Sequence, residues 1–95
     1  MSEIKNQNKK SEIQEKLSEQ YENLLVADGL DDAIVGVTTV MGNDLVIYSI
    51  GKIVEVLMKR DGMTREEALE FFDFNIGGAY MGEKTPIYAW LIEDI

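Results

Sequence analysis

Two runs of β-branched residues, separated by a short turn-forming segment, constrain the fold of this chain more than any other feature. Residues 33–40 read AIVGVTTV, residues 45–50 read LVIYSI, and Met41-Gly42-Asn43-Asp44 lies between them. Gly and Asn tolerate the positive backbone φ values that tight hairpin turns require. The pattern therefore predicts an antiparallel hairpin, and the rest of the core has to pack against it.

A helix is predicted before the hairpin. Ser11-Glu12-Ile13-Gln14 fits the capping box, in which the Ser hydroxyl accepts one backbone N–H and the Gln side chain returns to another. Apolar residues then recur at positions 13, 17, 21, 24 and 25, which is one stripe of a helix. This spacing predicts a helix over residues 12–27, with Gly29 available to terminate it.

Two further helices and a strand are predicted after the hairpin. Residues 51–61 place their apolar side chains on one helical face and end at Asp61-Gly62. A second capping box at 64–67 opens a helix with two apolar stripes, and an apolar arc this wide predicts contact on two sides. Gly77-Gly78 either ends this helix or lets a neighbour approach closely, and residues 85–92 (TPIYAWLI) close the chain as a strand. The stripe expected in the core comprises Leu69, Phe72, Ile76 and Tyr80; the second stripe comprises Phe71 and Phe74.

The element order α-β-β-α-α-β predicts an α+β fold, with a small, mainly antiparallel three-stranded sheet packed with helices. Residues 11–95 are expected to form this single domain. Residues 1–10 are polar, aperiodic and carry a net charge of +2, which predicts a flexible tail.

Both faces of the predicted sheet are apolar, so alternation alone has to assign them. The face that we expect to meet the helices comprises Ala33, Val35, Val37, Leu45, Ile47, Ile87, Ala89 and Leu91. The opposite face comprises Ile34, Thr38, Val40, Val46, Tyr48, Tyr88, Trp90 and Ile92. Either the first helix covers this second face, or Tyr48, Tyr88 and Trp90 form a partner or homodimer surface, because Tyr and Trp are common binding anchors.

Composition excludes several function classes. The chain has neither Cys nor His, which excludes zinc fingers, catalytic thiols and Ser-His dyads. The whole chain carries −9 and residues 11–95 carry −11, which argues against direct nucleic-acid binding. No apolar run approaches 18 residues and residues 1–10 contain no apolar leader segment, so neither a membrane span nor a signal peptide is expected.

Two glycine-containing segments approach nucleotide-binding motifs without matching them. Residues 50–53 (IGKI) follow a strand as a P-loop does, but Ser or Thr is missing after the Lys, and Val46 stands at the position of the first Gly. Residues 77–82 (GGAYMG) have the wrong spacing for a dinucleotide fingerprint and follow a helix instead of a strand. No cofactor is therefore expected.

Acidic residues gather in one loop and on two predicted helices. Asp28, Asp31 and Asp32 are weak candidates for a metal or ligand site, since their spacing departs from the EF-hand pattern and Asp is common in such turns. Paired carboxylates perform acid–base chemistry only in a cleft that separates their pKa values, and no such cleft is predicted, so we expect no enzyme activity. The helical acidic residues, either a solvated face or a binding face, are Glu12, Glu15, Glu19, Glu22, Glu66, Glu67, Glu70 and Asp73.

Two polar residues of the C-terminal third are the remaining ligand candidates. Asn75 is polar among apolar neighbours, and we expect it either to cap the backbone of the 77–82 turn or to contact a ligand. Thr85 precedes Pro86 in what is expected to be a rigid lead-in to the last strand. These two residues and the Asp28–Asp32 loop form one site only if the fold brings them together.

Residues 28–88 carry a pattern of the form DG[FL]D…DGM-x-x-EEA…F-x-FNI-x-GAY-x-G-x-x-TP. It includes DGLD at 28–31, DGMTREEA at 61–68, FDFNI at 72–76 and GAYMGEKTP at 78–86. The pattern resembles a family of small uncharacterised phage and prophage proteins, from which the sequence departs at Leu30, where an aromatic residue is frequent. The resemblance implies a viral origin and action in the cytoplasm of a bacterial host, and it brings no biochemical activity with it.

Two classes of function follow from these observations. The first is a non-catalytic binding protein that acts on a host or phage protein; a sharper version is an acidic DNA mimic that inhibits a host defence nuclease of the CRISPR or restriction type. Net charge is also a plain solubility device, so acidity alone does not favour the mimic. The second class is a small-ligand or metal-binding domain. Homodimerisation is compatible with either class.

Overall fold

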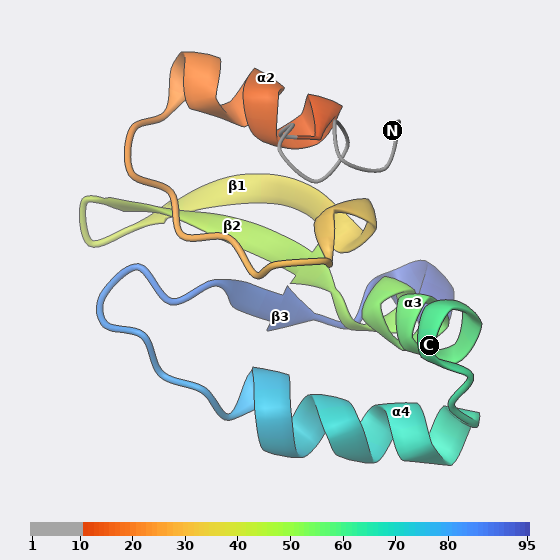
Figure 1. Ribbon diagram of the computed structural model, residues 1–95. Coiled ribbons are helices and arrows are strands. Elements are labelled where there is room, and N and C mark those ends of the chain that lie inside the picture. The colour runs from red at the N-terminus through yellow and green to blue at the C-terminus, as the bar shows by residue number, and fades with distance from the viewer. Residues whose placement is uncertain (1–10) are drawn as a thin grey trace.

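The computed structural model describes residues 11–95 and shows an α+β fold, which confirms the predicted class and, broadly, the predicted order of elements (Figure 1). The predicted tail, residues 1–10, lies outside the described residues. Two of the short elements are 3₁₀ turns (η1 and η3) and one is a π-helical turn (η2). In chain order the elements are α2 (Glu12–Gln20), η1 (Asp31–Ala33), β1 (Ile34–Val40), β2 (Asn43–Ser49), α3 (Ile50–Asp61), α4 (Arg65–Phe71), η2 (Phe72–Gly77), β3 (Ile87–Ala89) and η3 (Ile92–Asp94).

The three strands form one mixed sheet in the order β1-β2-β3. β1 and β2 make the longer, antiparallel ladder, whereas β2 and β3 pair in parallel. The parallel pairing arises because α3 and α4 carry the chain away from the end of β2 and back to its beginning, so that β3 runs in the same direction. Figure 1 shows α2 next to β1, α4 next to β3, and α3 at the end of the sheet where β2 finishes.

The predicted hairpin is present, with a shorter connection than the sequence suggested. Asn43 pairs with Val40, which leaves only Met41 and Gly42 in the turn. Their φ values of 51° and 85° are the two positive values that a type I′ turn requires. Asn43 and Asp44 therefore belong to β2 rather than to the loop.

A bulge in β1 changes which side chains share a face. Ile34 pairs with Tyr48 and Gly36 with Ile47, so that Val35 is the extra residue. After the bulge Val37 lies opposite Val46, on the Tyr48 face, whereas strict alternation places it with Leu45 and Ile47. The predicted faces of Val37, Thr38 and Val40 are therefore wrong, because one inserted residue reverses every later side chain of the strand.

The sheet face that packs into the core is also the opposite of the predicted one. Val46 and Tyr48 are fully buried in the cluster that contains α3, whereas the α2 helix contributes no buried residue. The tyrosine face can be buried because its rings have aromatic partners and the Tyr48 hydroxyl has a backbone partner, which alternation does not reveal. The core cluster comprises Leu30, Ala33, Val46, Tyr48, Ile50, Ile53, Val54, Leu57, Ala68 and Phe72.

The first helix is shorter than predicted and ends at Gln20. The chain then becomes extended, and Leu24 and Val26 pack against the core cluster. A continued helix would place Leu24 on the α2 stripe and Val26 on the opposite side of that helix. Half of the predicted capping box forms: the Ser11 hydroxyl accepts the Gln14 N–H at 3.1 Å, but the Gln14 side chain reaches Asp31 instead.

The helices after the sheet begin and end largely as predicted. α3 ends at Gly62, whose φ of 70° is the left-handed conformation that Gly adopts without strain. Thr64 and Glu67 form the complete capping box at the start of α4. Helical structure stops at Gly77, so Tyr80 is 79% exposed and not in the core, contrary to prediction. Gly77 also permits a close approach, because a Cβ there would lie 2.8 Å from the Phe72 ring.

Candidate functional site

Tyr48 and Tyr88, two of the three aromatic binding candidates, belong to the interior. Tyr48 is fully buried, and its hydroxyl accepts the Ala27 N–H at 2.7 Å. Tyr88 is half-buried, stacks on Tyr48 with ring centroids 5.5 Å apart, and meets Phe72 edge-on at 5.4 Å. Burial raises the pKa of both phenols above the ordinary value of 10.0. These two rings hold the sheet against α3 and α4 and present little surface to a partner.

Trp90 is the one member of this trio with substantial exposure. It follows β3 and is 41% exposed. Together with Asp94 and Ile95 it lines an open hollow of about 370 Å³. Ile92 and Ile95 are 86% and 87% exposed, so the C-terminal end of the described chain presents a small apolar surface.

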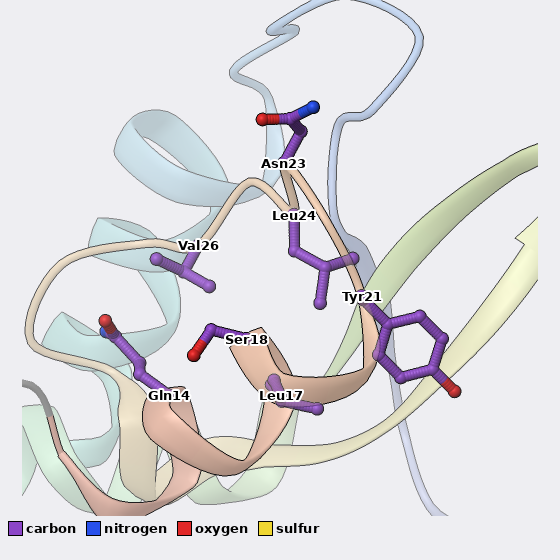
Figure 2. A pocket seen from close by; sticks show the side chains of 7 residues that line it. All are labelled: Gln14, Leu17, Ser18, Tyr21, Asn23, Leu24 and Val26. Carbon is purple, nitrogen blue, oxygen red and sulfur yellow. The ribbon is translucent and has the colours of Figure 1, made fainter.

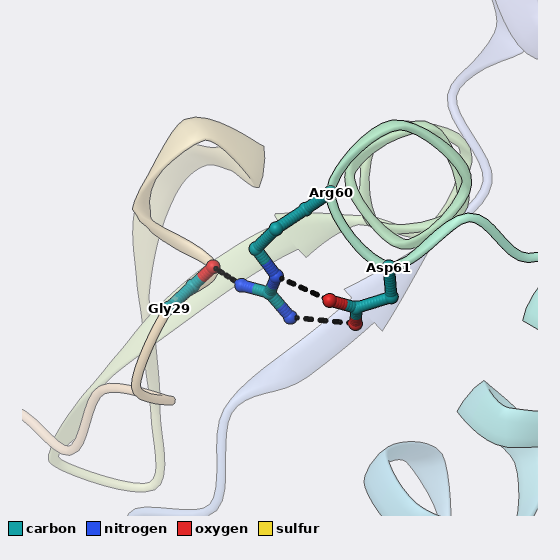
Figure 3. Close-up of polar contacts among 3 residues, drawn as sticks. All are labelled: Gly29, Arg60 and Asp61. Carbon is teal, nitrogen blue, oxygen red and sulfur yellow. Dashed lines mark hydrogen bonds and ion pairs between the residues drawn. The ribbon is translucent and has the colours of Figure 1, made fainter.

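The Asp28–Asp32 loop is held in place by polar contacts at both ends. The Asp31 carboxylate accepts both of its hydrogen bonds from the Gln14 amide, at 2.9 and 3.1 Å. Arg60 of α3 donates to the Gly29 carbonyl at 2.9 Å and to the Asp61 carboxylate at 3.0 and 3.1 Å (Figure 3). The hydrogen bonds from Arg60 hold the pKa of Asp61 below its ordinary value of 3.8.

These carboxylates do not assemble a metal site. Within residues 11–95, no three acidic side chains come together in an arrangement that would hold an ion. Asp28 and Asp32 are exposed, while Asp31 serves Gln14. The observed role of the loop is to link α2, through Gln14, and α3, through Arg60, to the start of β1.

Asn75 and Thr85 make local bonds of different kinds. The Asn75 amide donates to the Phe71 carbonyl at 3.3 Å, one turn earlier, so the prediction that it caps the 77–82 turn is wrong. Thr85 fills that role instead, because its hydroxyl accepts the Met81 N–H at 2.7 Å and donates to the Gly82 carbonyl at 2.6 Å. Figure 1 shows the 78–86 loop near the hairpin turn and η1 at the opposite end of the sheet. The fold therefore does not join Thr85 to the Asp28–Asp32 loop.

The two acidic sets are exposed and lie on separate parts of the fold. The first lies on α2 except for Glu22, which follows the end of that helix and was wrongly predicted to be helical; the second lies on α4 and η2. Figure 1 shows α2 and α4 at opposite margins of the sheet. Within the second set Glu67 accepts the Thr64 N–H at 2.9 Å, so one of its oxygens has a structural role. The first set comprises Glu12, Glu15, Glu19 and Glu22, and the second comprises Glu66, Glu67, Glu70 and Asp73.

A cavity of about 240 Å³ lies between α2 and the extended segment that follows it (Figure 2). Its walls are mostly apolar, and Leu17 and Leu24 point into it from opposite sides. Its polar side chains are engaged or on the rim: Gln14 bonds Asp31 and Ser18 donates to the Glu15 carbonyl. The volume is below the roughly 300–1,000 Å³ of typical ligand sites.

A second hollow, of about 430 Å³, lies where the end of α3 meets α4 and η2. Two phenylalanines from consecutive turns line it: Phe71 is 38% exposed and Phe74 is 83% exposed. These residues are the second apolar stripe of the sequence, which was predicted to contact another part of the fold. We call this hollow the Phe71–Phe74 groove; its lining residues are Asp61, Gly62, Met63, Glu67, Glu70, Phe71, Phe74 and Asn75.

The second apolar stripe of the sequence is the signal for this groove, although it was interpreted as a contact within the fold. The wide apolar arc of the 64–77 segment requires contact on two sides, and the structure supplies only the side of Ala68 and Phe72. Phe74 is left on the surface among carboxylates. The groove contains none of the three aromatic residues that the sequence pattern indicated for partner binding, so the sequence-based prediction missed this site.

Comparison with protein-family models, with curated proteins and with solved structures finds no match. The similarity to small phage proteins therefore stays an expectation from the sequence pattern. Within residues 11–95, no helix is both long and apolar enough to cross a membrane.

Proposed function

We propose that this chain is a non-catalytic binding protein that engages a host or phage protein and alters that protein's activity. The observation that carries the proposal is the exposure of Phe71 and Phe74 in one groove. Burial of a Phe side chain contributes about 1.5–3 kcal/mol of favourable free energy. The Phe74 ring is 83% exposed, so a partner that covers it would gain binding energy of this kind. Trp90 and the C-terminal isoleucines supply a second, smaller apolar surface.

Small size and phage-like sequence pattern support the same proposal. A chain of 95 residues has room for a recognition surface, and aromatic side chains are the residue types that most often dominate the binding energy of interfaces. A bacterial cytoplasm is the proposed setting, because the sequence pattern resembles that of phage proteins. Binding alters the partner's activity because this chain covers the partner's own binding surface, and the partner then loses access to its usual ligand.

Affinity capture from a bacterial lysate tests the proposal. The immobilised full chain is compared with Phe74→Ala, Trp90→Ala and a matched control, Met41→Ala, whose side chain is 97% exposed in the hairpin turn. We expect a captured protein that survives the control change and is lost with Phe74→Ala. A bait that retains nothing at either low or high salt would refute the proposal.

The DNA-mimic version of this function rests on the two exposed acidic sets, one along and just after α2 and the other along α4 and η2. A mimic occupies a basic groove through charge, so its inhibition should fall equally when acidic residues of either helix are neutralised and should not depend on Phe74. A binding protein that uses the Phe71–Phe74 groove depends on Phe74 and does not depend on the carboxylates of α2. Inhibition assays of a nuclease with Glu15→Gln/Glu19→Gln and with Phe74→Ala separate the two.

A further inference from the structure

We propose, on the basis of the proposed binding function, that the Phe71–Phe74 groove receives a basic amphipathic segment of its protein partner. An apolar side chain of that segment lies between the two phenylalanine rings, and Lys or Arg side chains on either side of it meet the carboxylates of the groove. The proposal commits the groove to one class of occupant, a peptide segment that combines apolar and cationic side chains.

Three apolar side chains line the groove and would contact an apolar side chain of a bound segment. Phe71 and Phe74 come from α4 and the π-helical turn, and Met63 comes from the α3–α4 connection. Met is flexible and polarizable, so it adapts to side chains of different shapes and makes favourable contacts with aromatic rings. A volume of about 430 Å³ accommodates a few side chains of a bound segment and is too open to enclose a small molecule.

Charge complementarity identifies the rest of the occupant. Asp61, Glu67 and Glu70 line the groove, and among residues 11–95 no Lys or Arg contributes to its lining. Arg60 offsets part of the Asp61 charge through two hydrogen bonds, which leaves Glu67 and Glu70 as the main carboxylates for a partner. An acidic segment would be repelled, whereas a cation is attracted both to the carboxylates and to the exposed ring faces.

The local geometry is rigid enough to serve as a preformed site. The capping box fixes Glu67 at the start of α4, since its carboxylate accepts the Thr64 N–H at 2.9 Å. Asn75 donates to the Phe71 carbonyl, which ties the π-helical turn to α4 where the two rings project. π-Helical turns are frequent at functional sites, and this one sets the spacing between Phe71 and Phe74.

Binding of defined peptides to the full chain tests this inference. The probe is a fluorescein-labelled 14-residue peptide of Leu and Lys, with Leu at the i, i+3, i+4, i+7 spacing of an amphipathic helix, and the control peptide has Glu in place of every Lys. Fluorescence anisotropy gives affinities, and ¹⁵N NMR shifts locate the site. We expect the basic peptide to bind and to shift the amides of Gly62, Phe74 and Asn75, and the acidic peptide to give no binding.

Matched variants separate the groove from general attraction to an acidic protein. Phe74→Ala should weaken binding by about fivefold and Glu70→Lys by about tenfold. Met41→Ala and Glu19→Lys, which match these changes in size and charge at exposed sites elsewhere, should change the affinity by less than about twofold. All four positions are exposed, and circular dichroism confirms that each variant is folded.

Three outcomes would overturn the inference. The first is an equal loss with Glu19→Lys and Glu70→Lys, which means attraction by net charge alone. The second is a set of peptide-induced shifts outside the groove. The third is a shift of the groove amides with protein concentration in the absence of peptide, which identifies a second copy as the occupant. If the groove fails but lysate capture succeeds and depends on Trp90, the proposed function stands and the basic-segment inference falls.

Discussion

Replacement of Tyr48 by Phe is the sharpest test of how this fold is held together. The ring is fully buried, so Phe preserves its packing and removes only the hydroxyl oxygen. That oxygen accepts the Ala27 N–H at 2.7 Å, and within the described residues this is the bond that links the extended segment after α2 directly to β2. The substitution therefore isolates one hydrogen bond between two elements that are distant in sequence.

The expected cost follows from the bond and its surroundings. A buried donor left without a partner costs about 1–3 kcal/mol, and Ala27 is only partly buried, so water recovers some of this loss. We expect the free energy of unfolding to fall by about 1.5 kcal/mol, which lowers the Tm by roughly 6–12 °C in a domain of this size. Tyr88→Phe removes the hydroxyl of the neighbouring, half-buried ring and should change stability by less than about 0.5 kcal/mol.

Urea denaturation followed by Trp90 fluorescence and far-ultraviolet circular dichroism measures both variants. Equal stability of Tyr48→Phe and the parent chain would refute the reasoning, because a 2.7 Å bond to a buried oxygen would then contribute nothing. A loss of partner capture at full stability would refute it in another way, since it would return Tyr48 to the role of a binding residue.

Burial of Tyr48 also leads us to expect that the free energy of unfolding falls in alkali. The neutral phenol is the protonated form, and burial raises its pKa in the folded state above the ordinary 10.0. The buried neutral phenol therefore stabilises the fold fully below pH 10. This stabilisation is lost as the pH rises through the folded-state pKa, where a tyrosinate must form in the interior. Tyr88 acts in the same direction, so Tyr48→Phe should reduce the alkaline loss without abolishing it.

Three further predictions concern other parts of the chain. In an NMR titration the pKa of Asp61 should lie below 3.8, so the ionised carboxylate stabilises the fold above that pH and this stabilisation is lost in stronger acid. Arg60→Gln should return the pKa of Asp61 toward 3.8. An unchanged pKa in this variant would contradict the hydrogen bonds shown in Figure 3. Thr64→Ala should destabilise the fold by about 1 kcal/mol in thermal unfolding through loss of the α4 cap, whereas Thr64→Ser should be nearly neutral. If the C-terminal apolar surface forms a homodimer, light scattering of Trp90→Ala should give a lower mass than the parent chain; a parent that is already monomeric dismisses the dimer.

Local signals in the sequence were reliable wherever short-range geometry decides the structure. The hairpin, the Gly62 helix end and the Thr64 capping box all form as predicted, because each depends on a few neighbouring residues and their allowed dihedral angles. The first capping box illustrates the limit. Gln14 satisfies the local pattern, but the more distant Asp31 competes for its amide and wins.

Predictions that required knowledge of distant neighbours failed for identifiable reasons. Alternation could not anticipate the extra residue at Val35, and a single bulge reverses the faces of all later residues in β1. Alternation placed Tyr48 on the face expected either to lie under the first helix or to meet a partner. The hydrogen-bond donor that lets it be buried in the core, the Ala27 N–H, comes from a segment expected to be helical. Phe74 was assigned to a packed interface that the fold does not provide.

The sequence by itself determined the class of the fold, the hairpin at its centre and the acidic, Cys- and His-free chemistry of its surface, because these depend on local pattern and composition. Only the tertiary structure decided which aromatic rings are available to a partner. Tyr48, Tyr88 and Phe72 find one another in the interior, whereas Phe71 and Phe74 are left outside. The physical reason is that burial depends on which faces meet in space, and an apolar side chain carries no local mark of whether its neighbour belongs to the same chain or to another.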